Sequence, residues 1–339
     1  MPANSIITVQ GVDLKLTNLD KVFYADGFTK GQVLDYYIRI APVLLPHIAD
    51  RPMSLKRYPH GAEGKFFYQK ECPANHPQWF KTIPVWSDGR GKHINFCVID
   101  SLPSLIWSAN MAVLELHPSL SRITNISRPA VLVFDLDPGE PASMIECAEV
   151  GLLLRSVLAA YGLDSFPKTS GSKGLQVYAP LNTVCDYEQT KSFAQQLAKA
   201  LEASRPDLIV AKMRKELRVG KVFIDWSQND EHKTTVSVYS LRAKARPTAS
   251  APVMWGEVEK VLKTRNPLLI DFTSQQVLDR VDKYGDLFSE VLTLQQKLPA
   301  LDNKKVTTKK AATRRSNKRG YSYDEADMPN SLSALESNH

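Results

Sequence analysis

Two aspartates at the end of an apolar run are the residues of this sequence best suited to chemistry. Asp135 and Asp137 follow residues 131–134 and precede the turn pair Pro138-Gly139. The β-branched and aromatic residues of the run are typical of a buried strand. Alternate residues of a strand point to one face, so the two carboxylates lie together and repel each other. A pair of Mg²⁺ or Mn²⁺ ions would hold them, although an acidic strand end facing water is the simpler interpretation.

Two further stretches supply what such a metal site needs. Residues 221–225 are another apolar run that ends in a carboxylate, Asp225. Residues 170–174 form a small-residue turn whose backbone N–H groups, Ser172 and Lys173 suit a phosphate chain, without the spacing of a Walker P-loop. Two carboxylates, a phosphate-binding turn and a third carboxylate are the parts of two-metal nucleotidyl transfer.

These three motifs resemble those of archaeo-eukaryotic primases. They read Asp-Leu-Asp-Pro-Gly at 135–139, Ser-Gly-Ser-Lys-Gly-Leu at 170–175 and Ile-Asp-Trp at 224–226. They are most similar to the polymerase domain of bacterial DNA ligase D and its stand-alone relatives, over roughly residues 1–300. The resemblance implies two Mn²⁺ or Mg²⁺ ions on the three aspartates. It also implies a nucleotidyltransferase that adds nucleotides, ribonucleotides by preference, to 3′-hydroxyl ends at gaps or double-strand breaks in non-homologous end joining.

The resemblance further implies a nucleotide-binding set. His117 ends a Leu-Glu-Leu-His strand, where the family places a His over the phosphates of the incoming nucleotide. Arg242 matches a triphosphate-binding Arg, whose fork can hold phosphate oxygens bidentately. Gln176 departs from the family, because many members carry His there. An uncharged amide in its place lowers activity if the His of the family serves catalysis, and not if it only contacts the phosphate or sugar. The full expected set is His117, Ser172, Lys173, Gln176, Arg242 and Lys56.

A pocket for a 5′-phosphate is implied near the N-terminus. Asn18 and Lys21 match family positions that hold the 5′-phosphate of the strand downstream of a gap, and Lys30 belongs to the same pocket. Local roles explain these residues equally well. Asn18 and Lys21 suit a turn, and Lys30 follows a Thr29–Gln32 capping box that starts a helix.

Three further residues are expected at the DNA. In an extended segment Phe66 and Phe67 point to opposite faces, so at least one lacks core cover and suits stacking on a base pair. An ordinary half-buried surface would explain the same pattern. Arg218, at the end of the basic run 212–218, matches a family Arg that holds the primer, although the run could equally be a solvated face.

Composition describes an ordinary globular chain with a mild basic excess. Of 339 residues 43% are hydrophobic and 23% charged, and the net charge is +7, of which residues 303–339 hold +4. This balance permits a nucleic-acid partner without demanding one. No apolar run approaches the roughly 20 residues of a membrane span. The four scattered cysteines, with Cys72 and His76 as half of a zinc site at most, favour a reducing cytoplasm, and nucleoid association is expected.

Strands that alternate with helices predict an α/β (α+β) fold. Helices are expected at 144–161 and 187–203 as crossovers behind the carboxylate strands, in an RRM-like catalytic core. We expect a primase-polymerase domain over 1–301, with an N-terminal lobe at 1–112 and the core at 113–300. Residues 302–339 are expected to be a disordered basic tail. No ligase module is recognised, so a DNA ligase in trans and Ku are expected partners, with no membrane.

Two rival interpretations remain. A haloacid-dehalogenase-type phosphatase also uses an Asp-x-Asp strand end, but it requires Thr or Val four residues after the first Asp, where this chain has Gly139. A non-catalytic protein of the same fold could bridge DNA ends. The presence of all three carboxylates argues against that interpretation.

Overall fold

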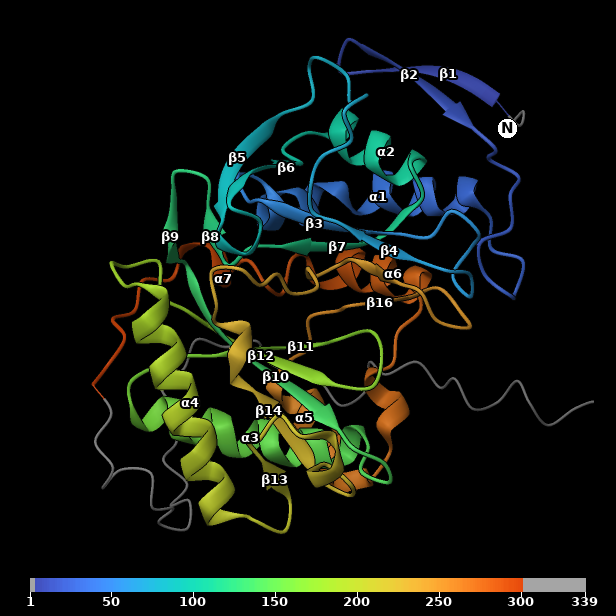
Figure 1. Cartoon of the computed structure of the whole chain (residues 1–339). Coiled ribbons are helices and arrows are strands. Elements are labelled where there is room, and N and C mark those ends of the chain that lie inside the picture. Colours follow the sequence, from blue (N-terminus) through green and yellow to red (C-terminus); the bar gives the residue numbers. More distant parts are fainter. Residues whose placement is uncertain (1–3, 301–339) are drawn as a thin grey trace, which may run out of the picture. The chain divides into compact units, whose positions relative to one another are not determined.

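A computed structural model describes residues 4–300, which contain two five-stranded sheets (Figure 1). In the second sheet β10 is central, flanked by β12 and β11 on one side and by β14 and β13 on the other, and only the β13–β14 pair is parallel. Its strands are β10 (Val131–Pro138), β11 (Phe166–Thr169), β12 (Leu175–Pro180), β13 (Ile209–Val210) and β14 (Val222–Asp225).

Two helices cover one face of this sheet, as the sequence predicts. They are α3 (Met144–Ala160) and α4 (Tyr187–Ser204), each begun by a capping box. Leu132, Phe134 and Leu136 of β10 pack with these helices in one core cluster, whereas Val131 and Val133 belong to the other cluster. Because side chains alternate along a strand, the aspartates of β10 lie on the face turned away from the two helices.

The first sheet carries the N-terminal half of the chain. β3 (Met53–Arg57) lies between β4 (Phe67–Gln69) and β6 (Lys92–Cys97), β6 pairs with β5 (Thr82–Ser87), and β7 (Val113–Pro118) also pairs with β3. Its core includes α1 (Lys30–Ile48), begun by the expected Thr29–Gln32 capping box, and α2 (Leu102–Asn110). The strand at 113–118, expected in the catalytic core, therefore lies in the N-terminal sheet.

Smaller elements complete the described chain. The expected N-terminal hairpin is present, and of the strand expected at 236–242 only its last two residues are extended. Their bounds are β1 (Asn4–Val9), β2 (Val12–Thr17), β8 (Ser121–Arg122), β9 (Asn125–Pro129), β15 (Leu241–Arg242), β16 (Thr248–Ala249), α5 (Trp255–Thr264), α6 (Ser274–Tyr284) and α7 (Glu290–Thr293). The expected tail at 302–339 lies outside the described residues.

A disulfide joins Cys72 to Cys97, which corrects the half zinc site suggested for Cys72 and His76. The loop after β4 lies against β6, where Cys72 N–H donates to Asn95 O at 2.6 Å. Strand pairing brings together two cysteines that are 25 residues apart in the sequence, which spacing alone does not reveal. None of the helices within residues 4–300 is long and apolar enough to cross a membrane.

Candidate active site

Four polar residues stand in a row across the second sheet. Asp135 in β10 pairs with Asp225 in β14 and with Gln176 in β12, and Gln176 pairs in turn with Lys168 in β11. Direct cross-strand partners point to the same face. Asp137 is two residues beyond Asp135, so all three carboxylates predicted to act together share one face of the sheet.

Crowding and repulsion make this carboxylate pair unstable as two anions. Desolvation and then the charge of Asp137 raise the pKa of Asp135 to about 7, against a hydrogen bond from the Gln176 amide. Desolvation and the charge of Asp225 likewise raise the pKa of Asp137, while Arg218 and Arg242 oppose the rise. A divalent cation bound to these oxygens would relieve the repulsion, so Asp135 and Asp137 suit the hard ions that the sequence predicts.

Asp225 is held differently. Its Oδ1 accepts hydrogen bonds from Ser227 N at 3.0 Å and Ser227 Oγ at 2.5 Å, and its Oδ2 accepts one from Gln228 Nε2 at 3.0 Å. Among residues 4–300 no three His, Cys, Asp or Glu side chains are close enough to hold a metal ion as they stand. These three hydrogen bonds leave Oδ2 of Asp225 with a further lone pair, so its carboxylate could also bind an ion.

The small-residue turn before β12 is tightly folded. Ser170 Oγ accepts from Ser172 N at 3.2 Å and Gly174 N at 3.1 Å, so two N–H groups expected to face a phosphate are already engaged. Gly171 has φ +67°, and a Cβ there would lie 2.6 Å from the backbone carbon of Ala249. Lys173 is exposed and pairs with Glu140 at 2.5 Å.

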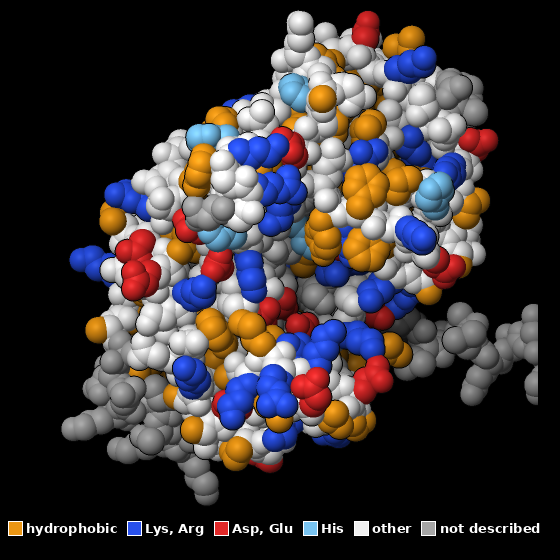
Figure 2. Space-filling model, viewed as in Figure 1, with side chains coloured by type: hydrophobic (Ala, Val, Ile, Leu, Met, Phe, Trp, Pro, Cys, Tyr) orange, Lys and Arg blue, Asp and Glu red, His pale blue; other side chains and the backbone are white. Residues whose placement is uncertain are grey.

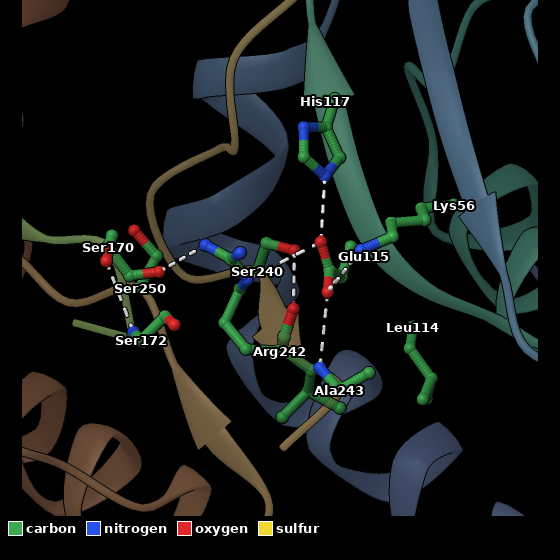
Figure 3. Close-up of polar contacts among 12 residues, drawn as sticks. Lys56, Leu114, Glu115, His117, Ser170, Ser172, Ser240, Arg242, Ala243 and Ser250 are labelled. Atoms are coloured by element: carbon green, nitrogen blue, oxygen red, sulfur yellow. Dashed lines mark hydrogen bonds and ion pairs between the residues drawn. The ribbon is translucent and has the colours of Figure 1, made fainter. Parts of the chain in front are cut away.

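Three of the expected nucleotide-binding side chains gather around one buried carboxylate (Figure 3). Two are the cations Lys56 and Arg242, and the third is the imidazole of His117, whose pKa burial lowers. Lys56 Nζ lies 3.4 Å from Glu115, His117 Nε2 lies 3.0 Å away, and Arg242 Nε lies 3.4 Å away. Register explains the grouping, because Lys56 of β3 stands opposite Glu115 of β7, with His117 two residues further along. Arg242 is also close enough to Asp137 to lower its pKa, so the cations adjoin the carboxylates.

The face that carries these groups is visible in Figure 2. Seen from the same side as Figure 1, Lys and Arg side chains border a hollow between the region of β4 and β7 and the region of β10 and β14, with acidic side chains inside it. Gln176 lies beneath this surface, 2% exposed, and its Nε2 donates to Thr235 Oγ1 at 3.2 Å. Gln176 thus contacts Asp135 and Thr235 from within the protein.

A family model described as "LigD, primase-polymerase domain" matches residues 29–288. This chain belongs to that family. It is 39% identical over 279 residues to the multifunctional non-homologous end joining protein LigD of Mycolicibacterium smegmatis, covering 81% of this chain and 36% of that protein. It is 34% identical over 274 residues to the bifunctional LigD of Bacillus subtilis, covering 80% and 43%.

A solved structure agrees with the family assignment. The polymerase domain from Mycobacterium tuberculosis Ligase D, in complex with DNA, has a TM-score of 0.77 and 39% identity, covering 84% of this chain and 99% of that one. The family and fold class predicted from the three motifs are therefore confirmed. This member of the LigD primase-polymerase family spans only 36% and 43% of the two curated relatives named above.

In this LigD-type chain, the residues expected at a 5′-phosphate lie close together. Lys21 N–H donates to Asn18 O at 3.1 Å, in a turn where Asn18 has φ +54°. Lys21 Nζ donates to Pro59 O at 2.6 Å. Lys30 is buried, and its Nζ donates to Thr17 O at 2.6 Å and to Asn110 Oδ1 at 2.8 Å. Burial and the charge of Lys21 lower the pKa of Lys30 to about 8.

The aromatic segment of this LigD-type domain is more exposed than the sequence predicts. Phe66 is 51% exposed, Phe67 45% and Tyr68 55%, so both predicted phenylalanines and a third ring face solvent. The Lys56 ammonium lies 4.1 Å from the centre of the Phe66 ring, and the Arg57 guanidinium lies 5.1 Å from that of Phe67. Exposed rings beside cations suit stacked bases with adjacent phosphates.

Arg218 lies at the edge of the carboxylates. Its guanidinium covers the Phe223 ring at 3.8 Å, and its Nη2 donates to Met213 O at 2.7 Å. Its Nε is buried without a hydrogen-bond partner among the described residues.

Sequence reasoning assigned no role to Glu115 or Lys168. Each is a charged residue next to apolar residues in a strand, Glu115 in Leu-Glu-Leu and Lys168 after Phe-Pro, which is the signal that could have found them. Lys168 is fully buried, and its Nζ donates to Ser250 Oγ at 2.7 Å.

Proposed function

We propose that this protein transfers nucleoside monophosphates from NTPs to a 3′-hydroxyl on a DNA template, at gaps or broken ends in non-homologous end joining. The observation that carries the proposal is that Asp135 and Asp137 lie beside Arg242, one of the basic residues around Glu115. Arg242 also donates a hydrogen bond to Ser170 O, in the small-residue turn at 170–174. Acidic groups for metal ions and basic groups for a triphosphate are the two halves of such a site. A preference for ribonucleotides and for Mn²⁺ over Mg²⁺ is part of the proposal.

Each group has a distinct part in the reaction. Bound divalent ions would neutralise charge on the reacting phosphoryl oxygens. Asp135 and Asp137 would hold both ions, and Asp225 would hold the one nearer the 3′-oxygen. The 3′-hydroxyl releases its proton to solvent and its oxygen forms a bond to the α-phosphorus. The bond from the α-phosphorus to the oxygen that bridges to the β-phosphate breaks, and pyrophosphate leaves. Arg242, Lys56, His117, Ser172 and Lys173 would bind the triphosphate and offset the charge that moves onto pyrophosphate.

The DNA would contact the remaining sites. Lys21 and Lys30, with Asn18, would bind the 5′-phosphate downstream of a gap, Phe66 and Phe67 would stack on the DNA end, and Arg218 would hold the primer. The solved DNA complex of a similar chain supports this proposal. A DNA ligase acting in trans and Ku are the proposed partners.

Replacing each aspartate tests the proposed chemistry. Asp135→Ala, Asp137→Ala and Asp225→Ala should each abolish extension, because an ion that lacks a ligand cannot stabilise the transition state. Primer extension is measured on a gapped duplex, a blunt duplex and a single strand, with NTPs or dNTPs and Mg²⁺ or Mn²⁺. DNA binding should persist, and Asp207→Ala, which removes an exposed carboxylate paired with Arg205, is the control.

Two results would contradict the proposal. Extension by an aspartate variant above about a tenth of the wild-type rate would exclude the two-metal assignment, because lost metal ligands cost orders of magnitude. DNA binding by the wild type without extension on any substrate would leave a protein that bridges DNA ends.

A further inference from the structure

A buried carboxylate lies beneath the cations proposed to bind the triphosphate (Figure 3). Glu115 in β7 is 2% exposed, and five donors surround it. Its Oε1 accepts from Tyr58 Oη at 3.0 Å, Ala243 N at 3.3 Å and Lys56 Nζ at 3.4 Å, and its Oε2 lies 3.0 Å from His117 Nε2 and 3.4 Å from Arg242 Nε. Burial alone would raise the pKa of Glu115, but the His117 hydrogen bond and the charges of Arg242, His117 and Lys56 hold it well below its ordinary value.

The donors come from separate parts of the chain. Lys56 belongs to β3, His117 to β7 and Arg242 to β15, and the Arg242 Nη1 atom also donates to Ser170 O at 2.5 Å. Contacts therefore run from the first sheet through Glu115 and Arg242 to the turn that carries Ser172. Among residues 4–300, Glu115 is the one carboxylate that contacts all three of these side chains.

The three side chains around Glu115 are partly exposed to solvent, whereas the Glu115 carboxylate is not. The side chains of Lys56, His117 and Arg242 are 13%, 10% and 16% exposed, against 2% for Glu115. The Tyr58 hydroxyl and the Ala243 N–H further bind Glu115 Oε1 from the protein. A phosphate chain would therefore approach the cations from outside, with Glu115 behind them. Burial lowers the pKa of His117 below its ordinary value, so the two fixed positive charges here are Lys56 and Arg242. These two cations repel each other, and a fixed anion between them offsets that repulsion before the nucleotide arrives.

We propose that Glu115 is a positioning residue that holds Lys56, His117 and Arg242 in the arrangement that receives the triphosphate of the incoming nucleotide. The inference rests on the proposed function and names the residue that organises its nucleotide site. Groups held in place before binding do not lose further freedom when the ligand arrives, so this arrangement favours nucleotide affinity.

Glu115→Gln tests the proposal, because it keeps the size of the side chain and removes its charge. The KM for NTP on a gapped duplex should rise roughly tenfold or more as the cations lose their common partner. The kcat should fall by a smaller factor than the KM rises, because Glu115 touches no reacting atom and acts on the reaction only through its three partners. The KM for DNA should not change. Affinity for ATP with Mg²⁺, measured by calorimetry without DNA, should fall in parallel.

Asp286→Asn is the matched control. Asp286 is a partly buried carboxylate, its side chain 15% exposed, between a His and a Tyr. It accepts from His47 Nε2 at 2.8 Å and Tyr239 Oη at 2.7 Å, and it contacts none of Lys56, His117 and Arg242. This variant should lose thermal stability and keep its KM. Glu115→Asp keeps the charge and withdraws the carboxylate by one methylene. It should give an intermediate rise in KM, and it provides a test if Glu115→Gln does not fold.

Three results would overturn the proposal. The first is an unchanged KM in a folded Glu115 variant. The second is a lower KM, which would make Glu115 a competitor for the cations. The third is an equal rise in KM in Asp286→Asn, which would reduce the effect to general destabilisation. Failure of the proposed function is read separately, from a wild type that neither binds ATP nor extends DNA, and it would remove this inference as well.

Discussion

At the scale of single residues, Lys30 shows how burial lowers the pKa of a cation. Burial and the neighbouring Lys21 lower its pKa from 10.5 to about 8, although Thr17 and Asn110 accept hydrogen bonds from its ammonium. Because the folded protein binds this proton less tightly than the unfolded chain, Lys30 lowers the free energy of unfolding below pH 8. That loss diminishes as pH rises from 8 towards 10.5. A phosphate bound nearby would favour the charged form and raise the pKa again.

Preference for a 5′-phosphate should therefore depend on pH. At pH 7 we expect the wild type to bind a gapped duplex with a downstream 5′-phosphate roughly tenfold more tightly than one without it. The ratio should decline as pH rises through about 8, where free Lys30 loses its proton. Dissociation constants for both duplexes would be measured from pH 7 to 9.5 at one fixed salt concentration.

Two variants should locate the effect. Lys21→Ala should erase most of the preference, and Lys30→Met should leave a smaller preference that no longer varies with pH. Lys199→Met removes an equal charge from α4 and serves as the control. Equal affinity of the wild type for both duplexes across the whole pH range would exclude a phosphate pocket at these lysines.

At the scale of elements, the turn after β10 is held against the loop that carries Arg218. Gly139 N–H donates to Lys221 O at 2.8 Å, and Gly220 N–H donates to Gly139 O at 3.0 Å. A Cβ on Gly139 would lie 2.0 Å from the backbone oxygen of Arg218. Glycine is therefore required here by close approach of two backbones, and this approach sets Arg218 beside the aspartates.

Gly139→Ala should separate the turn from that loop. We expect the free energy of unfolding to fall by about 1–3 kcal/mol, the usual cost of overpacking, with weaker primer binding as Arg218 shifts. Gly256→Ala in α5 is the control, because a Cβ there meets nothing within 4 Å, and alanine in a helix gains up to about 1 kcal/mol. Denaturant unfolding and primer affinity measure both variants. If Gly139→Ala has the same free energy of unfolding as the wild type, the loop that carries Arg218 can move away from the added methyl group without loss of stability.

At the scale of the whole molecule, the two cores are interleaved along the chain. Val238, Leu241 and Leu278 pack into the cluster of the first sheet, while Val258 and Val261 of α5 pack into that of the second. Arg242, which follows the second sheet in the chain, can therefore reach Glu115 in the N-terminal sheet. Residues 301–339 lie outside the described part of the chain. Within them, positions 303–339 hold eight Lys or Arg and four acidic residues.

Removal of these residues should alter DNA affinity and leave the chemistry unchanged. A chain that ends at Ala300 should bind DNA with a shallower dependence on salt, because fewer counterions are released, and with the same turnover at saturating DNA. Binding titrations at several salt concentrations measure the slope. The full chain with its eight C-terminal Lys and Arg replaced by Ser is the matched control and should behave like the shorter chain. Reduced turnover in the shorter chain would show that these residues support the folded body.

The sequence by itself determined the parts of this protein that depend on near neighbours. Alternation along residues 131–137 placed Asp135 and Asp137 on one face, and Thr29 with Gln32 predicted the start of α1. Helical periodicity likewise located α3 and α4, and the three motifs identified the family. These features can be predicted from the sequence because the alternation of side chains along a strand and the capping of a helix depend on only a few neighbouring residues.

Only the tertiary structure decided which distant residues meet. Glu115 contacts Arg242 across 127 positions of sequence because β7 lies against β15, and Cys72 bonds to Cys97 because the loop after β4 lies against β6. The strand at 113–118 joined the first sheet for a similar reason, since its partner β3 lies over fifty residues earlier. Strand order and register are set by packing across the whole fold. The local sequence pattern therefore shows that Glu115 is a charged residue in a strand, but it does not show which residues surround it.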